Sequence, residues 1–283
     1  MSHPRDWYVD IAGQGPDLVL LHGLGASSFS WRHNRAQLAR HFRVITPDLP
    51  GHGRSPAPPD EDYHTEALVR GLGDFLDWHG LKTVALGGNS LGGGLSLLLA
   101  GEQPERVSAL VLLAPAAAVT RVPYAFWPLR LPVLGYAMTS LLGPWLLPWF
   151  MRLVYRHPEG IIPEAVAGYA PPYRNLRRRL ALRQVCRNLE IRPLGEIAAL
   201  LRGLTQPTTL IWGERDRILD PAQGHWIAAH LPQAEFHLLP DVGHAPQEEA
   251  PELVNKIIID FLGRSIKNVG NETASPFKRR EQP

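Results

Sequence analysis

The stretch GGNSLGG, residues 87–93, surrounds a single serine with four glycines. An apolar run typical of a buried strand precedes it at residues 83–86, and a segment of helical length follows at residues 90–102. In the inner pattern Gly88-Asn89-Ser90-Leu91-Gly92, a strand ends, the chain reverses sharply and a helix begins, which leaves the serine hydroxyl exposed. Residues two positions from a strained serine must be small, and glycine meets that demand. We therefore predict that Ser90 is a nucleophile.

Short apolar runs recur along the chain, and segments of helical length separate several of them. The strand-like runs are residues 18–21, 44–46, 83–86, 109–113, 209–212 and 236–239, and the helical segments are residues 65–79, 90–102, 221–231 and 251–262. Strands that alternate with helices predict βαβ units and a mostly parallel sheet with helices on both faces. We assign residues 1–119 and 203–263 to this α/β core.

The alternation breaks at residues 120–202, where we expect an inserted helical cap. This segment contains 21 consecutive uncharged residues, 131–151, which is long enough to cross a membrane. Pro132, Pro144 and Pro148 interrupt the run, and a crossing would separate Ser90 from its expected partners. We therefore favour an apolar cap, with peripheral contact to a lipid surface, over a membrane span. The polar residues 264–283 are expected to form a disordered tail.

Composition restricts the class of protein. The chain has 283 residues, of which 45% are hydrophobic and 20% charged, as in a globular protein. Its net charge of +2 is too small to indicate nucleic-acid binding. The single cysteine, Cys186, cannot form an internal disulfide, and no cysteine–histidine cluster suggests a metal site. The N-terminal residues lack the apolar core of a signal peptide, so we expect a cytoplasmic protein.

A serine nucleophile needs a general base, and the base needs an orienting acid. In this architecture the chain order is serine, acid, histidine, each just after a strand. His244 stands in a loop between the strand-like residues 236–239 and the terminal helix, and it is the favoured base among 12 histidines. His225, His230 and His237 are alternatives on a helix surface or in a strand.

The acid should follow the preceding strand. Asp216 lies in the loop just after residues 209–212, where its carboxylate could reach an imidazole. Asp220 and Asp241 are the alternatives, the first as a helix N-cap before Pro221 and the second as a turn residue. We favour Asp216 as the acid.

Acyl chemistry also needs hydrogen-bond donors for a developing oxyanion. The backbone N–H of Leu91, directly after the serine, is one candidate. The second should come from the loop after residues 18–21, where glycines on both sides let the N–H of Leu24 turn inward. Because both roles use the backbone, the two leucine side chains are expected to line the pocket.

Five motifs together resemble the α/β-hydrolase superfamily over residues 7–263: HGLG at 22, PDLPGHGRS at 47, GNSLGG at 88, GERD at 213 and GHAPQEE at 243. The resemblance implies an α/β-hydrolase fold with a cap over the substrate pocket. It also implies a triad of Ser90, Asp216 and His244, with Leu24 and Leu91 as oxyanion donors, and a reaction that uses no metal or organic cofactor. Asp48 and Ser55 are expected to be structural loop residues.

The residues at and next to the predicted nucleophile restrict the reactions that the protein could catalyse. Haloalkane dehalogenases and epoxide hydrolases have aspartate in place of Ser90, so serine implies an acyl-enzyme intermediate. With Asn89 directly before Ser90, the serine turn resembles that of the hydrolases that cleave carbon–carbon bonds in ring-fission products. In those enzymes a tryptophan follows the histidine and a cap arginine holds a substrate carboxylate, whereas Ala245 follows here. Arginines 177–179 are interpreted as a solvated helix face.

The aromatic cap indicates an apolar, small-molecule ester substrate. We expect Asn89, Trp127, Trp145 and Trp149 to line the pocket, and Trp145 and Trp149 are also candidates for contact with lipid. The sequence therefore predicts a serine esterase that resembles monoacylglycerol lipases. A carbon–carbon bond hydrolase, a thioesterase or acyltransferase, and a non-catalytic ligand-binding member of the same fold are the alternatives.

Overall fold

The computed structural model describes residues 2–58, 62–124, 126–141, 143–157, 159, 161–231 and 233–273. Within them seven strands form one sheet in the order β1-β3-β2-β4-β5-β6-β7. Strand β1 pairs antiparallel with β3, and every other neighbouring pair is parallel. The strands are β1 (Val9–Ala12), β2 (Asp17–Leu21), β3 (Arg43–Pro47), β4 (Val84–Asn89), β5 (Val107–Leu113), β6 (Thr208–Gly213) and β7 (Ala234–Leu239).

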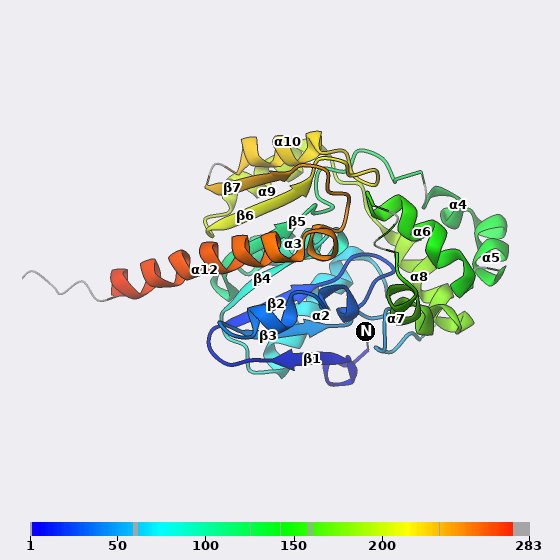
Figure 1. Cartoon of the computed structure of the whole chain (residues 1–283), viewed down its shortest axis with the longest axis horizontal. Helices are drawn as coiled ribbons and strands as arrows, with labels where there is room; N and C mark the ends of the chain where they lie inside the picture. The colour runs from blue at the N-terminus through cyan, green and yellow to red at the C-terminus, as the bar shows by residue number, and fades with distance from the viewer. Residues whose placement is uncertain are drawn as a thin grey trace, which may run out of the picture.

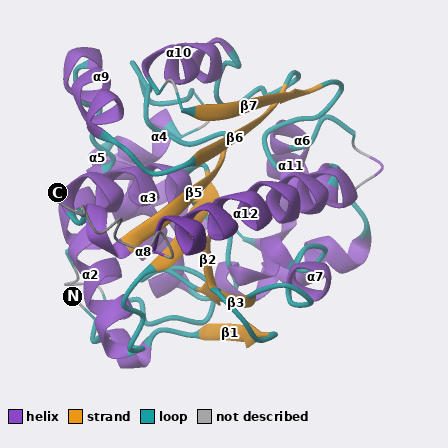
Figure 2. Cartoon of the chain, turned by 90° about the vertical axis from the view of Figure 1, so that its left-hand side faces the viewer, coloured by secondary structure: helices purple, strands orange, loops and turns teal. Residues whose placement is uncertain are grey.

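Apolar layers bury both faces of the sheet. Side chains alternate along a strand, so Val19 and Leu21 of β2 join one apolar cluster while Leu18 and Leu20 join the other. Helix α12 lies across one face, and α2 and α3 lie on the opposite side (Figure 2). Burial on both faces explains why the inner strands β2 to β6 consist mainly of apolar runs. The helices of these layers are α1 (Arg35–Leu38), α2 (Thr65–Trp78), α3 (Leu91–Glu102), α9 (Leu194–Gly203), α10 (Ala222–His230) and α12 (Pro251–Thr273).

Further helices lie between β5 and β6 and gather at one end of the molecule (Figure 1). Helices α4 and α5 pack on α8, and α7 packs on α6 and α8. We call this group, α4 to α8, the cap. Its helices are α4 (Trp127–Arg130), α5 (Pro132–Leu141), α6 (Leu147–Val154), α7 (Pro163–Tyr173) and α8 (Leu176–Asn188).

The long uncharged run is not one helix. It is divided into α5, the 3₁₀ turn η4 (Pro144–Leu146) and α6, because each of its prolines lies in the first turn of an element. Among the described residues, no helix is both long enough and apolar enough to span a membrane.

The structure differs from two of the predicted segment boundaries, and it contains one strand that was not predicted. The cap does not extend to residue 202, because α9 packs on α3 and α10 and buries Ile197 and Leu201 in the core. Residues 264–273 are not a disordered tail, because α12 continues to Thr273; the rest of the predicted tail, residues 274–283, lies outside the described residues. Strand β1 was missed because this short edge strand is only partly buried and lacks an apolar run.

Candidate active site

Ser90 lies in a sharp turn between β4 and α3. Its backbone has φ 53° and ψ −114°, a region that non-glycine residues rarely adopt. Hydrogen bonds hold this conformation: the Ser90 N–H donates to the carbonyl of Leu113 over 2.9 Å, and the Ser90 carbonyl accepts from the N–H groups of Gly94 and Ala116. The neighbouring structure therefore stabilises a strained serine at the end of β4.

The glycines on either side of the turn are needed for close packing. A Cβ atom at Gly88 would lie 2.5 Å from the carbonyl oxygen of Leu21, and one at Gly92 would lie 2.6 Å from the same oxygen. Both distances are far shorter than van der Waals contact. The turn can therefore pack against the end of β2 only if both positions lack a side chain.

Asp216 and His244 are in direct contact although they come from different loops. The Asp216 Oδ2 accepts a hydrogen bond from His244 Nδ1 over 2.7 Å, and both side chains are buried. The other carboxylate oxygen accepts from the N–H groups of Ile218 and Leu219, which orients the carboxylate. A carboxylate can only accept, so the proton of this hydrogen bond lies on Nδ1.

The alternative residues lie elsewhere. The Asp220 carboxylate accepts from the Ala222 N–H at the start of α10, and Asp241 forms ion pairs at the surface. His230 contacts the carbonyl of Trp226 within α10, and His237 lies within β7. The structure therefore brings Asp216, and not the other candidate acids, to His244.

Two contacts fix the backbone of His244. The Asn89 side-chain amide donates to the His244 carbonyl over 3.0 Å, which ties the histidine loop to the serine turn. The His244 N–H donates to the carbonyl of Val154 over 2.8 Å, and Val154 is the last residue of α6 in the cap. The loop is thus attached to the sheet on one side and to the cap on the other.

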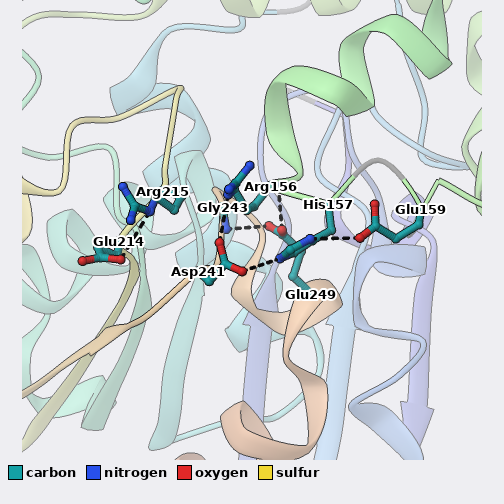
Figure 3. A network of polar contacts seen from close by, with 8 residues as sticks. All are labelled: Arg156, His157, Glu159, Glu214, Arg215, Asp241, Gly243 and Glu249. Atoms are coloured by element: carbon teal, nitrogen blue, oxygen red, sulfur yellow. Dashed lines mark hydrogen bonds and ion pairs between the residues drawn. The ribbon is translucent and has the colours of Figure 1, made fainter.

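Figure 3 shows a second attachment between the cap and the histidine loop. The Glu249 carboxylate accepts from the Gly243 N–H over 3.0 Å and from the Arg156 N–H over 2.7 Å. Burial raises the pKa of Glu249, although these backbone donors act in the opposite direction. Nearby, Asp241 accepts from the side chains of Arg156 and His157. The chain that leaves α6 is therefore linked to Asp241 directly and to Gly243 through Glu249.

The loop after β2 lies alongside Ser90. A Cβ atom at Gly23 would lie 3.4 Å from the Ser90 Cβ, so the Gly23–Leu24 backbone passes close to the serine. His22 anchors this loop, because its Nδ1 donates to the Gly23 carbonyl and its Nε2 accepts from the Leu49 N–H. Burial lowers the pKa of His22 to about 4, so the ring is neutral at pH 7. On the other side of the serine, Leu91 is the first residue of α3, where backbone N–H groups have no partner within the helix.

Ser90 borders two cavities of about 100 and 140 Å³. The first is largely apolar, and the second also contains Asn89 and His244. Leu24 and Phe126 border both cavities, so the serine lies where they meet. Apolar residues of the first cavity include Leu91, Leu95, Leu98, Ala117, Val119, Val122, Ile197 and Leu200, and those of the second include Leu129, Leu146, Leu147, Phe150 and Met151.

The structure contradicts part of the predicted pocket. Asn89 borders the second cavity, but Trp127, Trp145 and Trp149 border neither and are 58%, 69% and 51% exposed. The side chains that do border the cavities are their neighbours, such as Phe126 and Phe150. In short helices interrupted by prolines, the pattern of apolar residues does not reveal which face turns inward.

The sequence analysis also missed a group of polar residues at the second cavity. They are Ser30, Tyr155, Tyr169, Gln247 and Glu248. Only Gln247 and Glu248 carried a signal, since both belong to the GHAPQEE motif that follows His244. The other three come from a loop after β2 and from the cap, where no motif marks them.

Known proteins resemble this chain over most of its length. A family model described as the alpha/beta hydrolase family matches residues 18–257. The pimeloyl-[acyl-carrier protein] methyl ester esterase of Nitrosomonas europaea is 31% identical over 256 residues, which cover 87% of this chain and 95% of that protein. The 2-hydroxy-6-oxo-6-phenylhexa-2,4-dienoate hydrolase of Burkholderia cepacia is 27% identical over 264 residues, 90% of each chain. A thermophilic esterase from Thermogutta terrifontis superposes with a TM-score of 0.78 at 26% identity, covering 92% of this chain and 93% of its own.

Proposed function

The chain belongs to the alpha/beta hydrolase family, and from that premise we propose that it is a serine hydrolase of carboxylic esters with apolar acyl groups. One observation carries the proposal. Ser90 and His244 border the same cavity, and the buried carboxylate of Asp216 accepts a hydrogen bond from His244 Nδ1. A nucleophile, a base and an orienting acid thus occur together beside an apolar cavity.

The proposed reaction proceeds through an acyl-enzyme. His244 Nε2 takes the proton of the Ser90 hydroxyl, which attacks the ester carbonyl, and the N–H groups of Leu24 and Leu91 donate to the resulting oxyanion. His244 then protonates the leaving alcohol. It next activates a water molecule, which releases the acid from Ser90. Asp216 holds the imidazole ring and stabilises its positive charge in both halves of the reaction.

The cavities favour neutral esters over ring-fission diketones, which carry a carboxylate. Arg192 is the one arginine of the described residues that borders either cavity, and its guanidinium donates to Glu66 over 2.5 Å. The carbon–carbon bond hydrolases would need an arginine free to hold a carboxylate. The thioesterase and acyltransferase alternatives share the same acyl-enzyme and differ only in the leaving group or the acceptor.

The first test compares the wild type with Ser90→Ala on 4-nitrophenyl acetate, butyrate, octanoate and dodecanoate. We expect the wild type to turn over at least one of these esters, and the variant to lose about 10⁴-fold or more in kcat. If the folded wild type fails equally at every acyl length, the ester hydrolase proposal is wrong. A ring-fission diketone would then test the carbon–carbon alternative.

We also propose that the outer face of the cap contacts an anionic lipid surface. Trp127, Trp145 and Trp149 expose their side chains on elements of the cap. Residues 127–188, which span the cap, contain nine arginines and two glutamates, with no lysine or aspartate, whereas the whole chain has a net charge of only +2. Exposed aromatic rings combined with positive charge suit the interface of a bilayer that contains anionic lipids.

Co-sedimentation with vesicles tests this contact. The wild type should bind phosphatidylcholine vesicles that contain phosphatidylserine better than vesicles without it, and the double variant Trp145→Ser, Trp149→Ser should bind both less. Trp78→Ser is the matched control, because Trp78 is 55% exposed on α2, outside the cap. Binding that is unchanged in the double variant would exclude this surface.

A further inference from the structure

Polar side chains form part of the lining of the second cavity. The Glu248 carboxylate accepts hydrogen bonds from the hydroxyl groups of Tyr155 and Tyr169, each over 2.8 Å, and it forms an ion pair with Arg32. The Glu248 side chain is only 6% exposed. Burial is the main reason that the pKa values of both tyrosines are raised, so they remain uncharged donors. The cluster therefore has no net charge, because Arg32 balances Glu248 and both tyrosines are uncharged.

Two buried polar atoms of residues that border the same cavity have no partner among the described residues. They are the hydroxyl of Ser30 and the amide oxygen of Gln247, whose residues are each about 1% exposed. Ser30 lies in the 3₁₀ turn η2 (Ser28–Trp31), and Gln247 lies in α11 (Pro246–Glu249), close to His244. Both residues border the second cavity. Buried polar atoms nearly always form hydrogen bonds. Two such atoms without a partner at the same cavity therefore indicate a binding site for a ligand.

The surrounding charges restrict the chemistry of that ligand. A hydroxyl group could donate to the Gln247 amide oxygen and exchange a hydrogen bond with the Ser30 hydroxyl. A carboxylate or an ammonium group would be buried without a counter-ion, because Arg32 and Glu248 already neutralise each other. The site thus suits an uncharged group that carries hydroxyls.

The position of the site relative to Ser90 identifies the part of the substrate that it would hold. Most residues that border the first cavity are apolar and suit an acyl chain, although Thr65, Glu190 and Arg192 border it too. The second cavity combines apolar residues with the polar residues described above. Building on the proposed ester hydrolase function, we propose that Ser30 and Gln247 bind the free hydroxyls of the leaving alcohol. The substrate class is then a fatty acyl monoester of a small polyol, such as glycerol.

Two esters with the same acyl chain test this proposal. Propyl octanoate and 2,3-dihydroxypropyl octanoate have the same three-carbon alcohol skeleton and differ only in two hydroxyls. For the wild type we expect kcat/KM to be about tenfold higher for the dihydroxypropyl ester, as two additional hydrogen bonds would give. In Ser30→Ala and in Gln247→Leu the ratio of the two kcat/KM values should fall towards 1.

Ser28→Ala is the matched control for Ser30→Ala. Ser28 belongs to the same 3₁₀ turn but borders neither cavity, so this variant should keep the wild-type ratio. A wild-type ratio near 1, which is expected if only water contacts Ser30 and Gln247, overturns the proposal without any variant. A high ratio that survives both cavity substitutions overturns it as well. If the folded wild type hydrolyses neither these esters nor the nitrophenyl esters, the ester hydrolase function itself fails.

Discussion

The side-chain amide of Asn89 donates to the carbonyl oxygen of His244 over 3.0 Å, so the residue before the serine turn holds the loop of the histidine. The same amide nitrogen donates to the carbonyl of Leu113 over 3.2 Å. Asn89 is buried and has both carbonyls as acceptors. It therefore acts as a positioning residue that ties the candidate base to the strand end that carries the nucleophile.

Replacing this donor should impair turnover more than binding. Asn89→Asp keeps the shape of the side chain but directs a carboxylate at two carbonyl oxygens, whereas Asn89→Ala only removes the donor. We expect losses in kcat of about 100-fold for the aspartate and about tenfold for the alanine, with smaller changes in KM. Steady-state kinetics on the preferred nitrophenyl ester measure both values. An aspartate variant as active as the alanine variant would contradict the positioning role.

The backbone strain at Ser90 predicts a gain in stability when the side chain is removed completely. Ser90→Gly and Ser90→Ala both lack the hydroxyl, but only glycine adopts φ 53° without a steric penalty. The free energy of unfolding should therefore be about 1 kcal/mol higher for the glycine variant than for the alanine variant. Urea denaturation of the two inactive proteins measures the difference. Equal stabilities would show that the turn is not strained.

Adding one methyl group to a glycine should have opposite effects at two positions. In Gly92→Ala the new Cβ would meet the carbonyl of Leu21 at 2.6 Å, so we expect a loss of about 1–3 kcal/mol in the free energy of unfolding. In Gly195→Ala, in α9, the Cβ meets nothing within 4 Å, and the lower entropy of the unfolded chain should stabilise the protein by about 0.5–1 kcal/mol. Thermal denaturation of the pair measures both effects, and a tolerated Gly92→Ala would contradict the packing at the turn.

Two buried histidines predict that stability falls in mild acid. Burial is the main cause that lowers the pKa of His22 to about 4 and that of His52 to about 3, from an unfolded value of 6.5. Between pH 6.5 and 4 the unfolded chain therefore binds more protons than the folded protein. The free energy of unfolding should fall as the pH decreases, by up to about 1.4 kcal/mol per pH unit for each histidine.

The variant His52→Asn measures how much one of the two histidines contributes to this pH dependence. Asparagine can still donate to the Pro50 carbonyl, as His52 Nδ1 does over 3.0 Å, but it does not titrate. Denaturant unfolding at several values between pH 6.5 and 4.5 should give a shallower dependence for the variant than for the wild type. Parallel curves would show that His52 is protonated equally in the folded and the unfolded chain.

Local sequence predicted the frame of the molecule well. Six of the seven strands and the main flanking helices follow from runs of apolar residues. The inner strands β2 to β6 give the clearest runs because they are buried on both faces. The residues proposed as nucleophile, base and acid were located because each follows such a strand. The structure places Asp216 against His244 as that reasoning required.

The predictions that failed concern features that no short stretch of sequence encodes. The orientation of Trp127, Trp145 and Trp149 depends on which face of a short helix meets its neighbours, and the end of the cap depends on where α9 packs. Neither property is encoded within a few residues of the position itself.

The sequence by itself thus determined the α/β fold and the positions of Ser90, Asp216 and His244, because strand periodicity and turn glycines act between near neighbours in the chain. Only the tertiary structure decided what surrounds them. Ser30 comes from the loop after β2 and Gln247 from α11 near the other end of the chain, and they meet at one cavity. Such a site arises from packing between distant segments, and no single stretch of sequence contains it.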